Sequence, residues 1–355
     1  MRVAIEAATL TLTSGGLARY TGELSLALAR AFPGDEFYLV CDRPFPMPSG
    51  APANLRRGGG PRNAAERRWW LWGLTRELSR LGADIIHGPD FAVPYLARRP
   101  SVLTLHDLSP WMNRRWHHAA QRVRRRTPAL LELGIATMVI TPSESVRKQA
   151  IERFRLHPDR VVSIPEAAAP WFAPAPPEMP PDPPYFLFVG TLEPRKNVPM
   201  LVEAWREVRR DHCVDLVLVG RKRDDFPGFS AYSNVEGLRW LGEVADRDLP
   251  PLYSGALALV YPSLYEGFGL PVLEAMQCGA CVIVSPAVRE AAADAGLYAS
   301  DTAELAAAMR AVCEKPDLAA EMRARSIARA REFSWERTAQ ATCEVYREAR
   351  RRFGK

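Results

Sequence analysis

The sequence lacks the features that mark membrane-embedded and secreted proteins. Its 355 residues contain no apolar run long enough to span a bilayer. The start of the chain, MRVAI, reads as a strand because it is not part of the long apolar stretch of a signal peptide. We therefore expect a cytoplasmic protein. Hydrophobic residues at 47% and charged residues at 25% are typical of a globular chain.

Metal-binding patterns are also scarce. Among the six cysteines, Cys278 and Cys281 have the spacing of metal ligands, but no second pair or nearby histidine completes a site. We interpret this pair as structural. The segment Asp246-Arg247-Asp248 matches Asp-x-Asp by letters, yet it lies where a helix should start, and we expect Asp246 to cap that helix. The sequence therefore predicts no metal and no bound cofactor.

Lysine is rare, and the basic residues are unevenly distributed. Only five of the 47 basic residues are lysine, and residues 1–180 carry a net charge of +8, whereas residues 181–355 carry −2. A basic half is compatible with a nucleic-acid-binding protein, which is the alternative from a different functional class. However, the chain has no RNA- or DNA-binding motif and no recognisable stacking platform. We expect no nucleic-acid partner.

Short apolar segments alternate with helical ones along the whole chain, which predicts parallel sheets covered by helices. In the first half, the expected strands are Arg2–Glu6, Glu36–Val40, Asp84–His87, Val102–Leu105, Thr137–Thr141 and Val161–Ile164. The expected helices there are Arg19–Arg30, Trp69–Leu81, His118–Leu133 and Ser143–Phe154. The fold class is α/β, with doubly wound, Rossmann-like sheets.

A dense run of prolines divides the chain. It extends from Pro174 to Pro184, and such a run cannot join the interior of a sheet or helix. We expect an N-terminal domain over 1–170, a linker over 171–184, a C-terminal domain over 185–335 and a final helix over 336–355. Ligands of doubly wound sheets collect at the carboxyl ends of the strands, so two such domains would face each other across a cleft.

The segment from Tyr261 to Cys281 is the most informative part of the chain. It contains Glu266 and Glu274, separated by seven residues, and Pro271, which suits the first turn of a helix. The free N–H groups and the dipole of a helix start can seat a phosphate. Each carboxylate can accept hydrogen bonds from a vicinal diol. One phosphate seat between two diol-binding carboxylates predicts a site for a nucleotide sugar.

This segment resembles the Glu-x7-Glu signature of the retaining glycosyltransferases of family 4, which have the two-domain GT-B fold. The similarity extends from Tyr185 to about Trp335, and more faintly over the N-terminal half. The resemblance implies that Glu266 steadies the donor sugar and that Glu274 binds the ribose. It also implies donor contacts along the intervening loop, at Gly267, Phe268, Gly269 and Leu270. The alternative is an ordinary buried helix entrance whose glutamates face water.

A cationic segment follows the predicted strand that begins at Tyr185. Arg195 offers a bidentate fork and Lys196 a compact charge, both beyond the strand's carboxyl end. Family 4 enzymes place a basic pair here to hold the diphosphate and to absorb charge as it leaves. Many members carry arginine where this chain has Thr191, so the charge is left to the basic pair. The alternative interpretation is a solvated loop with two surface cations.

Two further candidates lie in the first half. Gly15 and Gly16, between the first strand and helix, let the backbone approach a ligand, and the family's equivalent loop faces donor and acceptor. Their spacing is not a dinucleotide fingerprint, so NAD is not indicated. His106 ends a strand, and the resemblance implies that it contacts the transferred sugar. Asp107 either orients it or caps the following turn. His87 is a weaker candidate for the acceptor pocket.

The resemblance implies hexosyl transfer with retention and without a metal ion, in which cations and helix amides stabilise the leaving diphosphate. The segments Gly190–Asn197 and His106–Pro110 resemble those of bacterial mannosyltransferases of polysaccharide assembly. We therefore expect GDP-mannose as the donor and a glycan or a lipid-linked molecule as the acceptor. A nucleotide-sugar epimerase on the same fold is the alternative within enzymes.

Tryptophan and arginine occur together in two regions of the first half. These regions comprise Arg67–Trp72, Trp111, Arg114–His118 and Arg122–Arg126. Such segments suit a membrane interface, where the ring lies at headgroup depth and the cation meets anionic lipid. This interpretation predicts peripheral contact with the inner face of the membrane. A solvated basic face with tryptophans in the core is the equally supported alternative.

Overall fold

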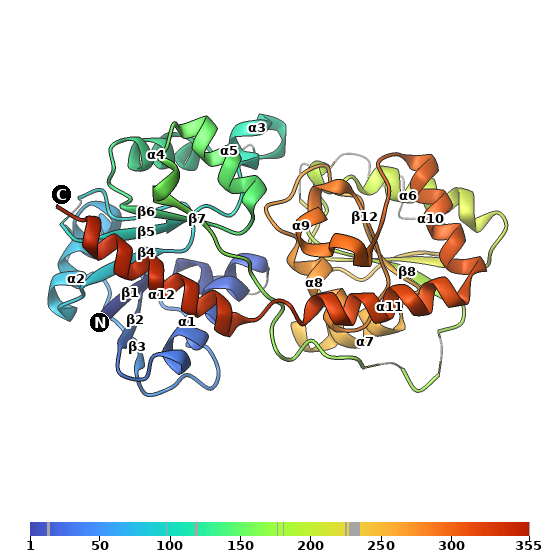
Figure 1. The fold of residues 1–355 in the computed structure, drawn as a ribbon, viewed down its shortest axis with the longest axis horizontal. Helices are drawn as coiled ribbons and strands as arrows, with labels where there is room; N and C mark the ends of the chain where they lie inside the picture. Colours follow the sequence, from blue (N-terminus) through green and yellow to red (C-terminus); the bar gives the residue numbers. More distant parts are fainter. Residues whose placement is uncertain are drawn as a thin grey trace. The chain divides into compact units, whose positions relative to one another are not determined.

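The computed structural model describes residues 1–12, 15–96, 98–117, 120–175, 177–179, 181–223, 226 and 235–354. They form two compact α/β domains (Figure 1). The N-terminal domain comprises Met1–Glu166 and Ser334–Lys355, and the C-terminal domain comprises Ala167–Phe333. His118 of a predicted helix, and Pro176 and Pro180 of the predicted linker, lie outside the described residues.

The N-terminal domain is built on a seven-stranded parallel sheet in the order β3-β2-β1-β4-β5-β6-β7. Its strands are β1 (Arg2–Glu6), β2 (Glu36–Val40), β3 (Leu55–Arg57), β4 (Ile85–Gly88), β5 (Ser101–Thr104), β6 (Met138–Thr141) and β7 (Val161–Ser163). All but β3 lie where the sequence predicts them. This edge strand contains two exposed arginines, so it has no apolar pattern to reveal it.

Helices cover this sheet. They are α1 (Gly16–Ala31), α2 (Leu74–Leu81), α3 (Ser109–Met112), α4 (Gln121–Glu132), α5 (Glu144–Phe154) and α12 (Trp335–Arg352). A π-helical turn, η2 (Trp69–Gly73), precedes α2, so the single predicted helix over 69–81 is two elements. Short 3₁₀ turns complete the domain at η1 (Ala8–Thr11), η3 (Arg114–Trp116) and η4 (Pro158–Arg160).

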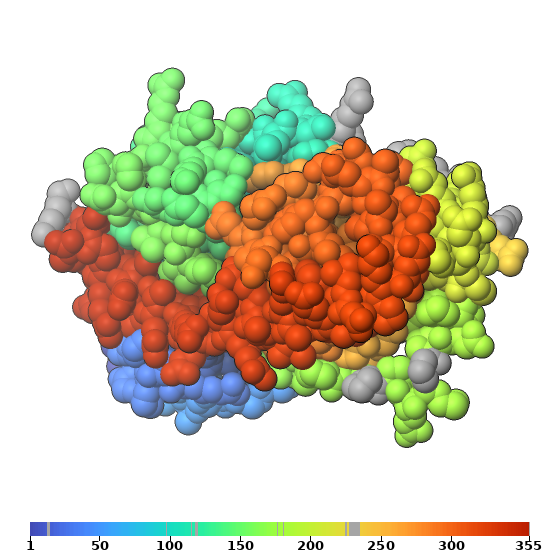
Figure 2. Space-filling view, turned by 45° about the vertical axis from the view of Figure 1, so that its right-hand side comes forward, coloured from blue at the N-terminus to red at the C-terminus, as the bar shows by residue number. Residues whose placement is uncertain are grey.

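The last helix, α12, returns to the N-terminal domain. It packs against α1, β5 and β6, and Figures 1 and 2 show its red residues beside the blue start of the chain. Ser334 begins it, because the side-chain oxygen accepts a hydrogen bond from the Arg337 N–H at 3.2 Å. Trp335, Ala339 and Tyr346 lie on its buried face at helical spacing. The final segment of the chain is therefore part of this domain's core.

The C-terminal domain has a six-stranded parallel sheet in the order β10-β9-β8-β11-β12-β13. Its strands are β8 (Tyr185–Val189), β9 (Asp215–Val219), β10 (Leu238–Trp240), β11 (Leu259–Tyr261), β12 (Val282–Val284) and β13 (Gly296–Tyr298). Its helices are α6 (Val198–Arg209), α7 (Leu249–Gly255), α8 (Leu270–Gln277), α9 (Arg289–Ala292), α10 (Thr302–Glu314) and α11 (Pro316–Ala330). The 3₁₀ turns are η5 (Pro194–Lys196), η7 (Asp246–Asp248), η8 (Pro286–Val288) and η9 (Ala293–Ala295).

Strand order reverses between β8 and β11 in this sheet, and between β1 and β4 in the other. In doubly wound sheets, ligands bind outside the carboxyl ends of the strands at such a reversal. The loops that follow β8 and β11 carry the predicted basic pair and Glu266. The fold therefore places both loops at the expected ligand position of the C-terminal sheet.

The predicted linker is partly packed. Phe172 is buried in the C-terminal core, with its ring centroid 6.0 Å from that of Tyr253. Gln277 donates hydrogen bonds to the carbonyls of Ala169 and Phe172 at 2.9 and 2.7 Å. The segment 171–184 is thus not a free connector throughout, and the C-terminal domain begins at Ala167.

Two smaller expectations concern the C-terminal domain. Asp246 does not occupy a cap position, since Ala245 precedes η7 and Asp248 precedes α7, so that prediction is wrong. Cys278 and Cys281 are buried, and burial raises the pKa of their thiols to about 12 and about 11. Both thiols therefore stay protonated at neutral pH.

Among the described helices, none has the length and apolarity needed to cross a membrane.

Candidate active site

The loop after β8 folds so that its cations meet the loop after β11. Pro194 opens the turn η5, and Asn197, in the left-handed region at φ 54°, ends it and leads into α6. The Leu264 N–H donates to the Arg195 carbonyl at 2.8 Å, which ties the two loops together. Neighbouring parallel strands end at the same edge of a sheet, so residues 70 positions apart come into contact.

Arg195, Lys196 and Glu266 form a buried ionic network there. The Arg195 Nη1 donates to Glu266 Oε2 at 3.0 Å, and the Lys196 Nζ donates to Glu266 Oε1 at 2.6 Å. Each of these side chains is at most 10% exposed. The interpretation as a solvated loop with surface cations is therefore wrong for the geometry of this segment.

Two residues that the sequence reading gave no role complete the network. Glu193 accepts from Arg195 Nη2 at 2.7 Å and from Arg223 Nη1 at 3.1 Å. Tyr261 accepts a hydrogen bond from Lys196, whose Nζ also lies 4.7 Å from the centre of the tyrosine ring. Among the described residues, three cations thus face two carboxylates. Glu193 lies in the segment Gly190–Asn197 and Tyr261 begins the segment with Glu266, but only the fold shows which residues their side chains contact.

The environment fixes the protonation of Glu266 and Tyr261. Burial acts to raise the pKa of Glu266, but the charges of Arg195 and Lys196 outweigh it and hold the pKa at about 2. Burial lowers the pKa of Lys196, while Glu266 opposes that change. Burial also raises the pKa of the Tyr261 hydroxyl well above its ordinary value. The site therefore holds an ionised carboxylate and a neutral phenol at neutral pH.

The loop from Gly267 leads into the start of α8. Gly269 has φ 108°, and a Cβ there would lie 2.8 Å from Val288 Cγ1, so only glycine fits. Having no side chain, it leaves the start of α8 without a side-chain cap, and Pro271 contributes no N–H. The N–H groups of Val272 and Leu273 donate to the Gly269 carbonyl at 2.9 and 3.3 Å, so this start offers an anion chiefly the positive end of its dipole.

Other predicted donor residues differ in exposure. Phe268 is buried, with its ring 5.6 Å from that of Phe333, and Leu270 is also buried. Gly267 and Thr191 are half-buried. Glu274 is 1% exposed and accepts a hydrogen bond from the Tyr253 hydroxyl at 3.0 Å. The alternative in which both glutamates face water is therefore wrong.

In the N-terminal domain, His106 is held by two acceptors. Its Nδ1 lies 3.1 Å from Glu166 Oε1, and its Nε2 lies 2.7 Å from the Pro89 carbonyl. Both ring nitrogens must carry a proton to donate in this arrangement, so the ring is an imidazolium. Burial opposes the charge, but Glu166 outweighs it and the pKa of His106 is raised. The Tyr20 ring packs edge-on against it at 4.7 Å.

Two other N-terminal candidates, Asp107 and His87, have different surroundings. Asp107 accepts from the N–H and hydroxyl of Ser109 at 2.9 and 2.6 Å, so it caps the following turn. His87 is fully buried between Tyr346 and Thr104, and burial lowers its pKa to about 3. Its prediction as an acceptor-pocket residue is therefore wrong.

The glycine pair begins α1. Gly15 immediately precedes the helix with φ 111°, a conformation that favours glycine, and no atom of the described residues beyond its chain neighbours lies within 4 Å of a Cβ built there. Gly16 is the exposed first residue of the helix. The backbone at this turn is thus open to the approach of another molecule.

Comparison with solved structures identifies the fold. Over 98% of both chains, the structure is similar to a sucrose-phosphate synthase from Thermosynechococcus elongatus, with a TM-score of 0.78 and 22% identity. It is similar over 100% of both chains to WaaG, a glycosyltransferase of lipopolysaccharide biosynthesis, with a TM-score of 0.70 and 16% identity. The two parallel-sheet domains have the GT-B fold, as predicted.

Sequence comparison gives the family. The model described as "Glycosyltransferase Family 4" matches residues 14–170, and that described as "Glycosyl transferases group 1" matches residues 183–315. The chain is 34% identical to the O-antigen chain mannosyltransferase B of Escherichia coli, over 74% of each chain. It is 27% identical to the serotype-specific mannosyltransferase WbdA of Escherichia coli, over 69% of this chain and 33% of that one. The chain belongs to glycosyltransferase family 4 and is a glycosyltransferase.

Proposed function

We propose that this glycosyltransferase moves mannose, with retention of configuration, from GDP-mannose to a glycan or lipid-linked acceptor of a bacterial polysaccharide. The observation that carries the proposal is the buried network of Arg195, Lys196 and Glu266 at the strand reversal of the C-terminal sheet. The mannosyl assignment is supported by the relatives, which are named as mannosyltransferases.

The network is suited to exchange its own anion for that of a substrate. Its cations attract a diphosphate, whose oxygens can take over the donors that Glu266 now occupies. The released carboxylate then accepts hydrogen bonds from hydroxyl groups of the donor sugar. The start of α8 adds the positive end of its dipole for the same diphosphate.

Transfer then proceeds on one face of the sugar. The bond from the anomeric carbon to the diphosphate breaks while a bond to the acceptor oxygen forms, and the leaving phosphate takes the acceptor proton. Arg195 and Lys196 stabilise the charge that develops on the leaving group, a role that requires no metal ion. In this proposal, the imidazolium of His106 exchanges one of its two present acceptors for an oxygen of the transferred sugar, and Glu274 binds the ribose.

The N-terminal domain supports a location at the inner face of the membrane. Its predicted tryptophan- and arginine-rich segments meet in the fold, since the Arg126 guanidinium lies 5.0 Å from the centre of the Trp70 ring. Trp72 is 40% exposed, whereas Trp69 is buried. A tryptophan and a cation at one surface suit the headgroup region of a bilayer.

Two measurements test the proposed reaction. A ligand that binds only the native state stabilises it by about 3 kcal/mol at a hundredfold excess over Kd. GDP should therefore raise the melting temperature more than UDP or ADP does if the site binds GDP most tightly. The protein with GDP-mannose, EDTA and membrane lipids should form an α-mannoside. Inversion at the anomeric carbon would contradict retention, loss of activity in EDTA would contradict metal independence, and donor isomerisation without acceptor would indicate an epimerase.

A further inference from the structure

A cavity of about 610 Å³ lies beside α4 in the N-terminal domain, built by residues that the proposed transfer does not use. Its basic members come from the first half of α4, and its apolar members come from that helix and two loops. It is lined by Tyr95, Gln121, Arg122, Arg125, Arg126, Ala129, Leu130 and Ile135. We propose that this cavity binds the phosphate headgroup of an anionic membrane lipid. The proposal deepens the membrane contact proposed above.

The arginines of this cavity share one face of the helix. Arg125 and Arg126 follow Arg122 by three and four residues, the spacing at which helical side chains are neighbours. Like charges at this spacing destabilise a helix. They also stand near its N-terminal end, where the dipole disfavours cations and the first turn has no acidic residue. An anion between them would remove both penalties.

None of these guanidinium groups forms an ion pair within the part of the chain that the structure describes. Arg122 and Arg125 are exposed, whereas Arg126 is half-buried and its Nε is a buried donor without an acceptor. Arg126 acts electrostatically on Asp90, a carboxyl whose pKa is raised by burial. Three guanidinium groups that line one cavity and form no ion pair among the described residues indicate where an anion would bind.

Trp70 contacts two of the residues that line the cavity, Arg126 and Tyr95. The Trp70 ring lies against the Arg126 guanidinium, and the Trp70 carbonyl accepts from the Tyr95 N–H at 2.9 Å. A guanidinium group held against a ring can still form two parallel hydrogen bonds with a phosphate. Ala129 and Leu130 supply apolar surface behind the arginines, as a glycerol or acyl segment requires.

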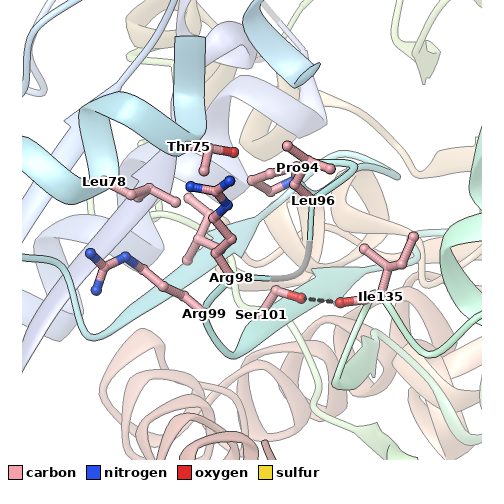
Figure 3. A pocket seen from close by; sticks show the side chains of 9 residues that line it. Thr75, Leu78, Pro94, Leu96, Arg98, Arg99, Ser101 and Ile135 are labelled. Atoms are coloured by element: carbon pink, nitrogen blue, oxygen red, sulfur yellow. Dashed lines mark hydrogen bonds between the residues drawn. The ribbon is translucent and has the colours of Figure 1, made fainter. Parts of the chain in front are cut away.

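Exposed apolar side chains on the surrounding elements favour a lipid surface over a free anion. Trp72, Met112 and Leu133 are 40%, 52% and 74% exposed, and they lie on or beside η2, α3 and α4. Figure 3 shows the adjacent hollow, which shares Ile135 with the cavity. Arg98 extends there toward Thr75 and Pro94, but the volume of about 10 Å³ suits a water molecule and not a headgroup.

Vesicle co-sedimentation of the full chain tests this site. Wild-type protein should bind vesicles of phosphatidylglycerol and phosphatidylcholine at physiological salt, and should not bind phosphatidylcholine alone. The variant Arg122→Gln/Arg125→Gln/Arg126→Gln should bind about a hundredfold more weakly, since each basic side chain at an anionic surface contributes about fivefold. The matched control, Arg43→Gln/Arg56→Gln/Arg153→Gln, removes three exposed arginines elsewhere in the domain and should change binding little.

A charge-preserving variant separates a built site from a diffuse basic surface. Arg122→Lys/Arg125→Lys/Arg126→Lys keeps every charge but loses the planar fork, and should still bind at least about tenfold more weakly. Wild-type binding by this variant would overturn the proposal. The proposal would also be overturned if a low concentration of inorganic phosphate or duplex DNA displaced the protein from vesicles by binding to these arginines. GDP should raise the melting temperature equally in all variants, so failure of nucleotide binding would be recognised separately.

Discussion

Lys196 donates a hydrogen bond to Glu266 at 2.6 Å, so a cation and an anion of the proposed donor site are already paired before any substrate arrives. Two loops that follow different strands hold this pair in a buried place. The site is therefore assembled in advance, and a diphosphate has to compete with an internal carboxylate.

Replacing Lys196 by alanine should lower kcat about a hundredfold to a thousandfold, because a preorganised donor to the leaving group is lost. Steady-state transfer with GDP-mannose measures the effect, and circular dichroism checks the fold. Lys222→Ala, at the end of the isolated bridge to Leu192, is the matched control and should keep near wild-type kcat. Equal kcat in both variants would show that Lys196 does not act on the leaving group.

Glu266→Gln should destabilise the free protein by about 3 kcal/mol, because it leaves Arg195 and Lys196 buried with less compensation. The same variant should show a larger rise in melting temperature with GDP than the wild type, since the diphosphate then supplies the missing anion. Differential scanning calorimetry with and without GDP measures both. An equal or smaller rise would mean that the nucleotide binds away from this network.

Stability should fall in acid through Glu266. Its pKa is about 2 in the folded protein and about 4.5 when unfolded, so the folded state binds its proton less readily. The contribution is fully present above pH 4.5 and is lost as the pH falls toward 2, amounting to about 3 kcal/mol. Urea unfolding across this window should show a shallower acid loss in Glu266→Gln. Parallel curves for the two proteins would refute the assignment.

His106 should titrate above its ordinary range. Burial opposes protonation, but Glu166 outweighs it and raises the pKa. The stability that the pair contributes is fully present below pH 6.5 and is lost as the pH rises through the raised value. NMR titration of the ring measures this pKa, which Glu166→Gln should lower. Glu152→Gln, on the exposed side of α5, should leave it unchanged. A pKa unaffected by Glu166→Gln would contradict the imidazolium assignment.

Glu274 offers a direct comparison between binding and packing. Glu274→Gln should weaken GDP binding about tenfold, since a charged acceptor of the ribose hydroxyls is lost. Tyr253→Phe removes the hydroxyl that donates to Glu274 and should lower stability while largely keeping GDP affinity. Calorimetric titration measures affinity, and urea unfolding measures stability. If both variants lower stability alone, Glu274 supports the fold and does not bind ribose.

Local sequence was sufficient for much of the fold. Short apolar runs predicted most strands, because each run lies within a few consecutive residues. The pattern failed at Leu55–Arg57, where an edge strand carries charged side chains, and over 69–81, where a π-helical turn interrupts the helix. It also treated 171–184 as a connector, because prolines mark the chain's breaks but do not show that Phe172 is buried.

The sequence by itself determined the two-domain α/β class and the short motifs that carry Glu266 and the basic pair, because these depend on neighbours along the chain. Tertiary structure alone decided which side chains meet. Glu193 and Tyr261 belong to the ionic network, His87 lies in the core, and the Arg126 guanidinium packs against the Trp70 ring. Such contacts join segments from different strands and helices, and their geometry is set by sheet order and packing, which no single stretch of sequence contains.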